Sequence, residues 1–307
     1  MPVVSLPDES WIADVGEVPG LELLAWDLHG PHPRADEIAL VVPPYIDGRM
    51  RLDLLGAMPV LEVVQLLTAG YDNVTPVLPE GVTLCNGGGI HDASTAELTL
   101  ALILASLRGI PDFVVAQQEP RWIRTRMWDA LADRRVLVVG YGNVGRAIVQ
   151  RLLPFEAEVT AVASRARAGD DLVDTVHGID ELSALLPEHD VVVLITPLTE
   201  ATEGLAGPEF LAAMKDGALL VNVARGKVVD TDALLAETTS GRLRAALDVT
   251  DPEPLPPEHP LWRAPGVLIS PHVGGASSAF RPRALALLRR QLQAYAAGKP
   301  LDNVVSR

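Results

Sequence analysis

Residues 135–145 read RVLVVGYGNVG, and this stretch decides the fold of the larger part of the chain. The run 135–140 is apolar and rich in β-branched residues, which is typical of a strand buried on both faces of a parallel sheet. A helical pattern follows directly over 143–153 and is ended by Pro154. The sequence therefore predicts a strand, a glycine-rich turn and a helix in immediate succession.

The turn GYGNVG (140–145) fits the GxGxxG pattern of dinucleotide-binding folds, and it stands in the strand-to-helix context that the pattern requires. Gly140 would make the tight turn, Gly142 would let the backbone approach a pyrophosphate, and Gly145 would let the helix pack closely on the strand. Asn143 and Val144 complete this cofactor loop. A glycine-rich turn without a ligand is the alternative.

Further strands and helices alternate on the carboxyl side of this unit. Buried strands are predicted at 158–163, 191–195, 218–223, 245–249 and 267–270, with helices at 180–186, 208–214 and 231–237. Such alternation indicates α/β architecture, and we predict a doubly wound, Rossmann-type parallel sheet.

The first 85 or so residues carry a second, weaker α/β series, with strands expected at 3–5, 21–25, 38–42, 60–66 and 82–84. A helix from about Ser94 to Leu107 follows it. The helix expected over 282–297 is assigned to the same small domain, which makes that domain discontinuous. The predicted division is a substrate domain of 1–96 and 282–307 around a dinucleotide-binding domain of 97–281.

The composition excludes several classes of protein. The chain of 307 residues is 48% hydrophobic and 21% charged, which is typical of a globular protein. Forty acidic against 25 basic side chains give a formal charge of −15, which disfavours nucleic acid and anionic membranes as partners. Cys85 is the single cysteine, and residues 1–11 lack the order of a signal peptide. We expect a cytoplasmic protein without a metal site.

The strand 158–163 is followed by Ser164, Arg165 and Arg167, where dinucleotide-binding folds usually place an acidic residue that binds the ribose hydroxyls. Without that carboxylate nothing repels a 2′-phosphate, and serine and guanidinium groups can donate hydrogen bonds to one. The sequence therefore predicts NADP(H) as the preferred cofactor. The alternative is that NAD(H) is also accepted and that both arginines are solvated loop charges.

Three later segments place unlike functional groups just beyond predicted strands. They are LLVNVARGKVVD (219–230) with Arg225, AALDVTDPEPL (245–255) with Glu253, and VLISPHVGGAS (267–277) with His272. Ligand sites in open α/β sheets lie off the carboxyl ends of the strands, so these groups are expected to converge. Each residue alone has an ordinary explanation as a surface pair, a loop charge or a buried histidine. Their joint occurrence predicts a catalytic site.

Together with GYGNVG, these segments resemble the D-isomer-specific 2-hydroxyacid dehydrogenase family over nearly the whole chain. Further matching landmarks are PLTEATEGL (197–205), AGYDN (69–73) and NGGGIHDASTAE (86–97). The resemblance implies a nucleotide domain inserted into a flavodoxin-like substrate domain, with the active site in the cleft between them. It also implies hydride transfer between the cofactor and a small 2-keto or 2-hydroxy acid of the glyoxylate or hydroxypyruvate type, with D specificity.

The same resemblance suggests a role for each candidate residue. Histidine titrates near neutral pH, so His272 is the expected proton donor, and Glu253 would orient it. Arg225 would bind the substrate carboxylate with backbone N–H groups near Ala69 and Gly70. The expected cofactor-lining residues are Arg225, His272, Thr196, Pro197, Val223, Ala224, Gly274 and Asp248, the last of which would position the nicotinamide carboxamide.

Two other functions remain open at this point. A phosphite-oxidising relative has the same triad, and some relatives are transcriptional corepressors that sense a dinucleotide. Formate-oxidising relatives have glutamine at the position of Glu253, so that branch is disfavoured. The loop Gly87–Gly89 matches no single substrate, and His91 is expected to be a hydrogen-bonding loop residue rather than a catalyst.

A basic and aromatic cluster lies between the two domains' main motifs. At this net charge the cluster favours a subunit interface over a nucleic-acid site, and relatives of this family usually dimerise through the nucleotide domain. A homodimer through that domain is therefore expected. The cluster consists of Arg121, Arg124, Arg126, Arg134 and Arg135, with Trp122 and Trp128.

Overall fold

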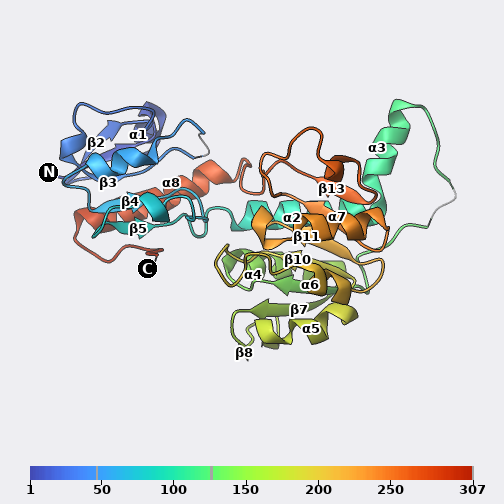
Figure 1. The fold of residues 1–307 in the computed structure, drawn as a ribbon. Coiled ribbons are helices and arrows are strands. Elements are labelled where there is room, and N and C mark those ends of the chain that lie inside the picture. The colour runs from blue at the N-terminus through green and yellow to red at the C-terminus, as the bar shows by residue number, and fades with distance from the viewer. Residues whose placement is uncertain (46–47, 125–126, 306–307) are drawn as a thin grey trace. The chain divides into compact units, whose positions relative to one another are not determined.

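The computed structural model describes residues 1–45, 48–124 and 127–305, and it divides into two compact units (Figure 1). The first unit contains Met1–His91 and Ser278–Arg307, and the second contains Asp92–Ser277. The second unit is thus inserted into the first along the chain. Both boundaries lie a few residues before the expected ones: helix α2 (Asp92–Arg108) belongs to the second unit from its first turn, and the helix expected from residue 282 already begins at Phe280.

The first unit is built on a five-stranded parallel sheet of order β2-β1-β3-β4-β5, which is the flavodoxin-like order. Helices α1 and α8 cover the same face of this sheet with apolar side chains such as Trp11 and Leu288. The elements are β1 (Val3–Leu6), α1 (Glu9–Val15), β2 (Glu22–Ala25), β3 (Ile38–Val41), β4 (Val63–Gln65), β5 (Thr83–Cys85) and α8 (Phe280–Ala296).

The second unit holds an eight-stranded sheet of order β13-β12-β11-β10-β6-β7-β9-β8, parallel except for the pair β8–β9. Its strands are β6 (Arg135–Val139), β7 (Glu158–Ala163), β8 (Arg167–Ala168), β9 (Thr175–Gly178), β10 (Val191–Leu194), β11 (Leu219–Asn222), β12 (Arg244–Leu247) and β13 (Val267–Ile269). Its helices are α2, α3 (Ile110–Gln118), α4 (Asn143–Leu152), α5 (Leu182–Leu185), α6 (Pro208–Ala213) and α7 (Thr231–Thr239).

The order of these strands reverses between β6 and β10. The chain runs outward from β6 through β7 to β9, and it then starts again at β10, beside β6, and runs the other way to β13. Open α/β sheets bind their ligands at such a switch point, outside the carboxyl ends of the strands. The loops that follow β6 and β10 are therefore the ones placed to hold a ligand.

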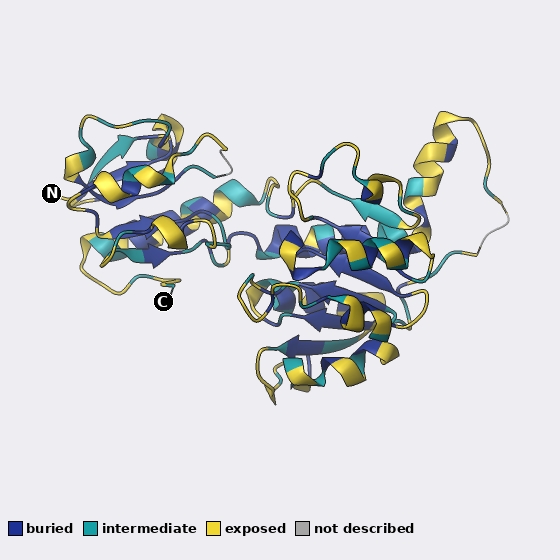
Figure 2. Ribbon diagram, viewed as in Figure 1, coloured by how far each residue is buried: buried dark blue, intermediate teal, exposed yellow. Residues whose placement is uncertain are grey.

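Both faces of this sheet are covered, which explains its near-continuous apolar strands. Val136 and Val138 of β6 lie in a core shared with α2 and α4. Leu137 and Val139 point to the opposite face, where α6 and α7 pack. Figure 2 shows that the central strands β6, β10, β11 and β12 are largely buried, whereas the edge strands β13 and β8 are partly or fully exposed. The predicted fold class, a doubly wound nucleotide domain inserted in a smaller flavodoxin-like domain, is confirmed.

Several details differ from the sequence-based expectation. Helices α1 and α3 and the short strands β8 and β9 were not predicted. The helix expected over 180–186 is a single α-helical turn, α5, between two 3₁₀ turns. β4 begins only at Val63, because the Leu61 N–H bonds to Met58 O in a turn that leaves Val60 exposed. β12 ends at Leu247, so Asp248 lies just beyond it.

The arginines of the basic and aromatic cluster do not form one uniform patch. Arg134 pairs with Asp129 at 3.0 Å, and Arg135 pairs with Glu188 at 2.5 Å. The Arg124 guanidinium lies 6.0 Å from the centre of the Trp122 ring. Arg126 lies outside the described residues. The charges at 134 and 135 are thus offset locally by carboxylates.

Among the described residues, no single helix is long and apolar enough to cross a membrane. Only α2 and α3 taken together have the length and composition for it, and they meet at a bend of 67°. Nine residues of α2 are buried within the unit.

Candidate active site

The glycine-rich turn lies at the switch point of the second unit's sheet. Gly140 has a φ of 114°, and a Cβ there would lie 2.5 Å from the Ile195 carbonyl oxygen. A Cβ on Gly145 would lie 1.9 Å from the Gly140 oxygen, so α4 can begin this close to β6 only with glycine. A Cβ on Gly142 would meet nothing within 4 Å. Space is therefore left over the start of α4, where the free N–H groups of a helix bind phosphate.

Thr196 follows β10 on the other side of this turn, and its side chain is buried. Its Oγ1 has no hydrogen-bond partner among the described residues. Buried polar atoms in native proteins are nearly always hydrogen-bonded, so this hydroxyl is a candidate to form a hydrogen bond with a bound ligand. Pro197 follows it, and the buried Val223 and Ala224 come just after β11. The turn and these residues fit a bound dinucleotide.

Arg225 is held just beyond β11 by a buried asparagine. Asn222 accepts a hydrogen bond from the Ala224 N–H and donates one to the Arg225 carbonyl oxygen, each at 3.0 Å. Arg225 itself is half-buried, and its Nη1 donates to Ala224 O at 2.8 Å. A Cβ on the next residue, Gly226, would lie 1.9 Å from Thr250 O. The Arg225 loop is therefore packed directly against the loop that follows β12.

His272 and Glu253 are joined by a hydrogen bond of 2.6 Å between Nδ1 and Oε1. His272 adopts a left-handed φ of 53°, which is uncommon outside glycine, and its N–H donates to Asp248 O at 2.7 Å. Both side chains are close to half exposed, at 47% and 41%. A histidine that donates through Nδ1 to a carboxylate presents Nε2 to a ligand, so this pair can exchange a proton with a bound molecule.

Asp248 organises the turn around His272. Its carboxylate is buried, and Oδ1 accepts hydrogen bonds from Ser270 Oγ at 2.6 Å and from the Val273 N–H at 2.9 Å. Oδ2 accepts from the Gly274 N–H at 2.8 Å, and a Cβ on Gly274 would lie 2.9 Å from this oxygen. Asp248 thus fixes the path of residues 270–274, a function that the sequence analysis did not foresee for it or for Ser270.

The groups expected to bind a 2′-phosphate follow β7. Ser164 and Arg165 are exposed, and no hydrogen bond or ion pair joins Arg165 to another residue in the described ranges. Arg167 lies in β8, whereas the alternative considered from the sequence made it a solvated loop charge. Its Nη2 donates to Tyr141 O at 2.8 Å, and its guanidinium lies 5.9 Å from the centre of the Tyr141 ring. One face of Arg167 is therefore engaged by the glycine-rich turn.

Two carboxylates beside this turn were missed by the sequence analysis. Asp170 accepts hydrogen bonds from the Tyr141 hydroxyl and from Arg146 Nε, each at 2.9 Å, and Asp171 pairs with the same arginine. The Leu172 N–H, together with Arg146 and Tyr141, lowers the pKa of Asp170 to about 2. Asp170 is therefore charged at neutral pH, and Arg146 offsets its charge. No motif signals this contact, because the partners are 24 to 29 residues apart.

The expected substrate residues of the first unit, Ala69 and Gly70, lie in a turn after β4. The Ala69 carbonyl accepts a hydrogen bond from Asn86 Nδ2 at 2.9 Å, and the Gly70 carbonyl accepts one from Thr68 Oγ1 at 2.7 Å. His91 is buried, and its Nε2 lies 2.8 Å from Leu67 O. In the part of the chain that is described, no three His, Cys, Asp or Glu side chains are grouped so as to hold a metal ion.

Comparison with known proteins gives the relatives of this chain. The family described as D-isomer specific 2-hydroxyacid dehydrogenase, NAD binding domain, matches residues 100–274. A glyoxylate reductase of Thermofilum pendens is 33% identical over 85% of this chain and 80% of its own length.

Solved structures agree with the sequence relatives over nearly the whole chain. An NADPH-dependent glyoxylate/hydroxypyruvate reductase from Sinorhizobium meliloti, in complex with NADP and sulfate, has a TM-score of 0.84 and 28% identity, covering 99% of this chain and 98% of that one. A D-isomer specific 2-hydroxyacid dehydrogenase from Xanthobacter autotrophicus, in complex with NADPH and MES, has a TM-score of 0.80 and 30% identity, covering 99% and 97%. The chain therefore belongs to the D-isomer specific 2-hydroxyacid dehydrogenase family and is an NAD(P)-dependent oxidoreductase.

Proposed function

We propose that this protein reduces a small 2-keto acid of the glyoxylate or hydroxypyruvate type to the D-2-hydroxy acid, with NADP(H) preferred over NAD(H). The observation that carries the proposal is the His272–Glu253 pair, with Nδ1 and Oε1 2.6 Å apart. It lies at the same edge of the sheet as Arg225 and the glycine-rich turn, since all three follow the carboxyl ends of parallel strands. The substrate class is supported by the Thermofilum and Sinorhizobium relatives, which are a glyoxylate reductase and a glyoxylate/hydroxypyruvate reductase.

The reaction needs a hydride, a proton and a cation for the substrate carboxylate. A bound nicotinamide supplies the hydride. His272 would hold a proton on Nε2 and donate it to the carbonyl oxygen, while Glu253 keeps the ring in place by accepting from Nδ1. Arg225 would pair with the substrate carboxylate, and the N–H groups of Ala69 and Gly70 are also proposed as donors to a carboxylate.

In this proposal the residues after β7 determine the choice of cofactor. Ser164 stands where a carboxylate would repel a 2′-phosphate, and the exposed guanidinium of Arg165 is placed next to it in the chain. Arg167 would contribute through the donors that Tyr141 O does not use. Arg146 pairs with both Asp170 and Asp171 and offsets one of their two negative charges.

A panel of keto acids tests the proposal. The purified protein is mixed with glyoxylate, hydroxypyruvate, pyruvate and longer 2-keto acids, each with NADPH and with NADH, and the loss of reduced nicotinamide absorbance is followed. We expect turnover with the small acids, faster with NADPH, and D-glycerate as the product from hydroxypyruvate. Oxidation of phosphite with NADP⁺ would favour the phosphite-oxidising alternative instead. Cofactor binding without turnover of any acid would favour a dinucleotide sensor.

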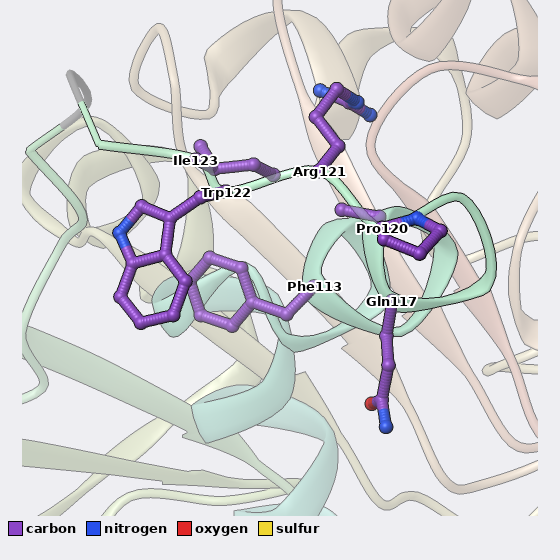
Figure 3. Close-up of a pocket in the computed structure, with 7 residues that line it drawn as sticks. Phe113, Gln117, Pro120, Arg121, Trp122 and Ile123 are labelled. Atoms are coloured by element: carbon purple, nitrogen blue, oxygen red, sulfur yellow. The ribbon is translucent and has the colours of Figure 1, made fainter.

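We also propose that the protein is a homodimer that forms through helix α3. Of the nine residues of this helix only Ala116 is buried, although the sequence is mostly apolar. Val114 and Val115 are more than half exposed, and Trp122 beyond the helix is 82% exposed. Phe113 and Trp122 line a common pocket, which Figure 3 shows beside the helix. A second copy of the same apolar helix is the partner that matches this surface, because an exposed patch of this kind marks an interaction site.

Sedimentation or light scattering tests the dimer. We expect the wild type to have the mass of two chains, and Val114→Glu combined with Val115→Glu to have the mass of one. Val60→Glu, at an exposed valine of the first unit, is the matched control and should remain a dimer. A wild type with the mass of one chain at micromolar concentration would contradict this proposal.

A further inference from the structure

Hydrogen bonds to its backbone carbonyl oxygens hold the turn that carries Ala69 and Gly70 in place. Four consecutive carbonyl oxygens each accept a hydrogen bond from a neighbouring group: Leu67 O from His91 Nε2 at 2.8 Å, Thr68 O from the Gly87 N–H at 2.7 Å, Ala69 O from Asn86 Nδ2 at 2.9 Å, and Gly70 O from Thr68 Oγ1 at 2.7 Å. Three of these four donors come from the segment 86–91, the NGGGIH stretch. That segment therefore acts as a brace behind the turn.

The brace determines where the amide groups of the turn point. In a planar trans peptide the C=O and the following N–H point in opposite directions. With the oxygens of Leu67, Thr68 and Ala69 directed into the brace, the N–H groups of Thr68, Ala69 and Gly70 are directed away from it. None of these three N–H groups donates to another residue within the described ranges. Successive free amides with a common direction form an anion-binding concavity.

His91 is itself fixed by two aromatic rings. The ring of Phe280 lies 5.6 Å from the imidazole at an interplanar angle of 4°, and the ring of Tyr45 lies 5.2 Å away at 22°. Tyr45 and Phe280 stack on each other at 4.0 Å. Because a carbonyl can only accept, Nε2 carries the proton of this imidazole. The stack thus holds the plane of the ring so that the Nε2–H is directed at Leu67 O.

The glycines of the same segment are explained by the closeness of the turn. A Cβ on Gly87 would lie 2.8 Å from both the carbonyl carbon and the oxygen of Leu67, so only glycine lets the brace reach the turn. Gly89 has a φ of 90°, which favours glycine at the bend before His91. Asn303 Nδ2 donates to Gly88 O at 3.0 Å and holds the loop from its other side.

We propose that His91, acting with Asn86 and Gly87, is a positioning residue that aligns the amides of Thr68, Ala69 and Gly70 for the substrate carboxylate. This inference rests on the proposed reduction of a 2-keto acid and gives the NGGGIH segment its function in that reaction. His91 transfers no proton in it. Its contribution is transmitted through the Leu67 carbonyl to the direction of the next N–H group.

The proposal makes a specific kinetic prediction. Backbone amides bind a carboxylate equally in the ground state and in the transition state, so loosening them raises KM and leaves kcat unchanged. A residue that only stabilises the fold would lower the melting temperature without this selective change. A residue that takes part in proton transfer would lower kcat. The three roles are therefore separable in one set of measurements.

The test compares His91→Leu and His91→Gln in the full-length protein. His91→Leu removes the donor, and we expect KM for glyoxylate and the inhibition constant of oxalate to rise about threefold to tenfold, the effect of one neutral hydrogen bond. We expect kcat and the dissociation constant of NADPH to stay within about twofold. His91→Gln keeps an N–H donor at a similar reach and should restore part of the affinity. Thr68→Val removes the donor to Gly70 O with little change of shape, and it should raise KM even if His91→Leu fails to fold.

A second buried histidine provides the matched control. His189 in the second unit also places a ring nitrogen, Nδ1, 2.7 Å from a carbonyl oxygen, that of Leu185. His189→Leu should lower the melting temperature and leave KM and the oxalate constant unchanged.

The outcomes separate the brace from the proposed function. If the wild type reduces glyoxylate but His91→Leu and Thr68→Val keep the wild-type KM and oxalate constant, or lose kcat instead, the brace is overturned and the proposed function stands. If the wild type neither reduces any keto acid nor binds oxalate by calorimetry, both are overturned. If it binds oxalate without turnover, the oxalate constants of the variants still decide the brace.

Discussion

The two ends of the cofactor site in the second unit are built differently. At the end formed by Arg225, Glu253 and His272, the loops are tied together by buried groups, and the Asp248 carboxylate alone accepts three hydrogen bonds from residues 270–274. At the other end, Ser164 and Arg165 follow strand β7 and are exposed. The two-residue strand β8 forms this edge of the sheet. The first end is fixed by packing and buried hydrogen bonds, whereas the second end presents exposed polar and charged side chains.

This difference indicates which property each end controls. Buried hydrogen bonds hold catalytic groups within a narrow range of positions, and reaction rates are sensitive to small displacements. Exposed groups contribute less, and salt screens their charges. Substitutions at the first end should therefore change the rate by orders of magnitude, whereas those at the second end should change the ratio of two cofactors.

The largest effect is expected from His272→Ala. Loss of a general acid lowers kcat by about 10² to 10⁴, and NADPH binding should persist because the glycine-rich turn is unchanged. Steady-state rates with the best keto acid and a fluorescence titration with NADPH measure the two quantities. His177→Ala is the matched control, since His177 also bonds to a glutamate, with Nδ1 2.9 Å from Glu181 Oε2. Near-normal turnover by His272→Ala would show that another group donates the proton.

A smaller loss is expected from Glu253→Gln. The amide oxygen can still accept from His272 Nδ1, so the ring keeps its orientation, but the neighbouring negative charge is gone. Hydrogen bonds to charged groups contribute roughly 1.5 to 3 kcal/mol, so kcat should fall about tenfold to a hundredfold. Glu253→Ala also removes the group that orients the His272 ring, so its kcat should be lower still. Equal losses in both variants would mean that the charge, and not the position of the ring, is what Glu253 provides.

The same two ends differ in how much the sequence could predict. GYGNVG and the three strand-end segments could be found because each candidate side chain or glycine lies within about a dozen residues of the strand that positions it. Glycines needed for close approach leave a direct mark on the sequence, as at Gly140 and Gly145, where a Cβ would lie within 2.5 Å of a backbone oxygen. Parallel pairing then brings the strand ends together without further information.

Contacts between distant side chains could not be predicted in this way. Nothing in the sequence pairs Tyr141 with Asp170, because the two residues are 29 positions apart and an exposed aspartate is common. The hydrogen bond from Ser270 Oγ to Asp248 Oδ1 could not be predicted from the sequence for the same reason. His91 was correctly expected to be a hydrogen-bonding loop residue, but its partner Leu67 O is 24 residues away and only the fold identifies it.

Cofactor choice tests the exposed end. We expect the wild type to favour NADPH over NADH by about tenfold or more in kcat/KM, the effect of one charge-assisted hydrogen bond to the 2′-phosphate. Ser164→Asp combined with Arg165→Ala should move the preference toward NADH with little change in keto-acid selectivity. The preference of the wild type should also shrink as salt rises. A wild type that favours NADH would show that Arg165 faces solvent and that the ribose is held otherwise.

Single arginine variants sharpen that result. Arg165 has no partner among the described residues, whereas Arg167 donates to Tyr141 O in the glycine-rich turn. Arg165→Ala should therefore weaken the binding of NADPH and leave the binding of NADH unchanged. Arg167→Ala should weaken the binding of both cofactors, because the glycine-rich turn loses a support, and it should weaken NADPH binding more, because the 2′-phosphate also loses a donor. An effect on NADPH alone would show that the bond to Tyr141 O does not support the turn.

The smallest effect concerns a histidine that supports the exposed end from below. His189 is buried, its Nδ1 donates to Leu185 O at 2.7 Å, and its Nε2 accepts from Thr160 Oγ1 of β7 at 2.9 Å. Burial lowers the pKa of His189 below the ordinary value of about 6.5. At a pH below about 6.5 the unfolded chain therefore binds a proton at this site that the folded chain does not, and the free energy of unfolding falls as pH falls. Above that pH both states are neutral at this site, and its contribution to the free energy of unfolding is constant.

His189→Gln should lower the free energy of unfolding at neutral pH but reduce its dependence on pH between 6.5 and the folded pKa. Urea unfolding at several pH values measures both effects. The preference between the two cofactors should be unchanged. If wild type and variant lost stability in parallel over that range, His189 would not be the group that takes up the proton on unfolding.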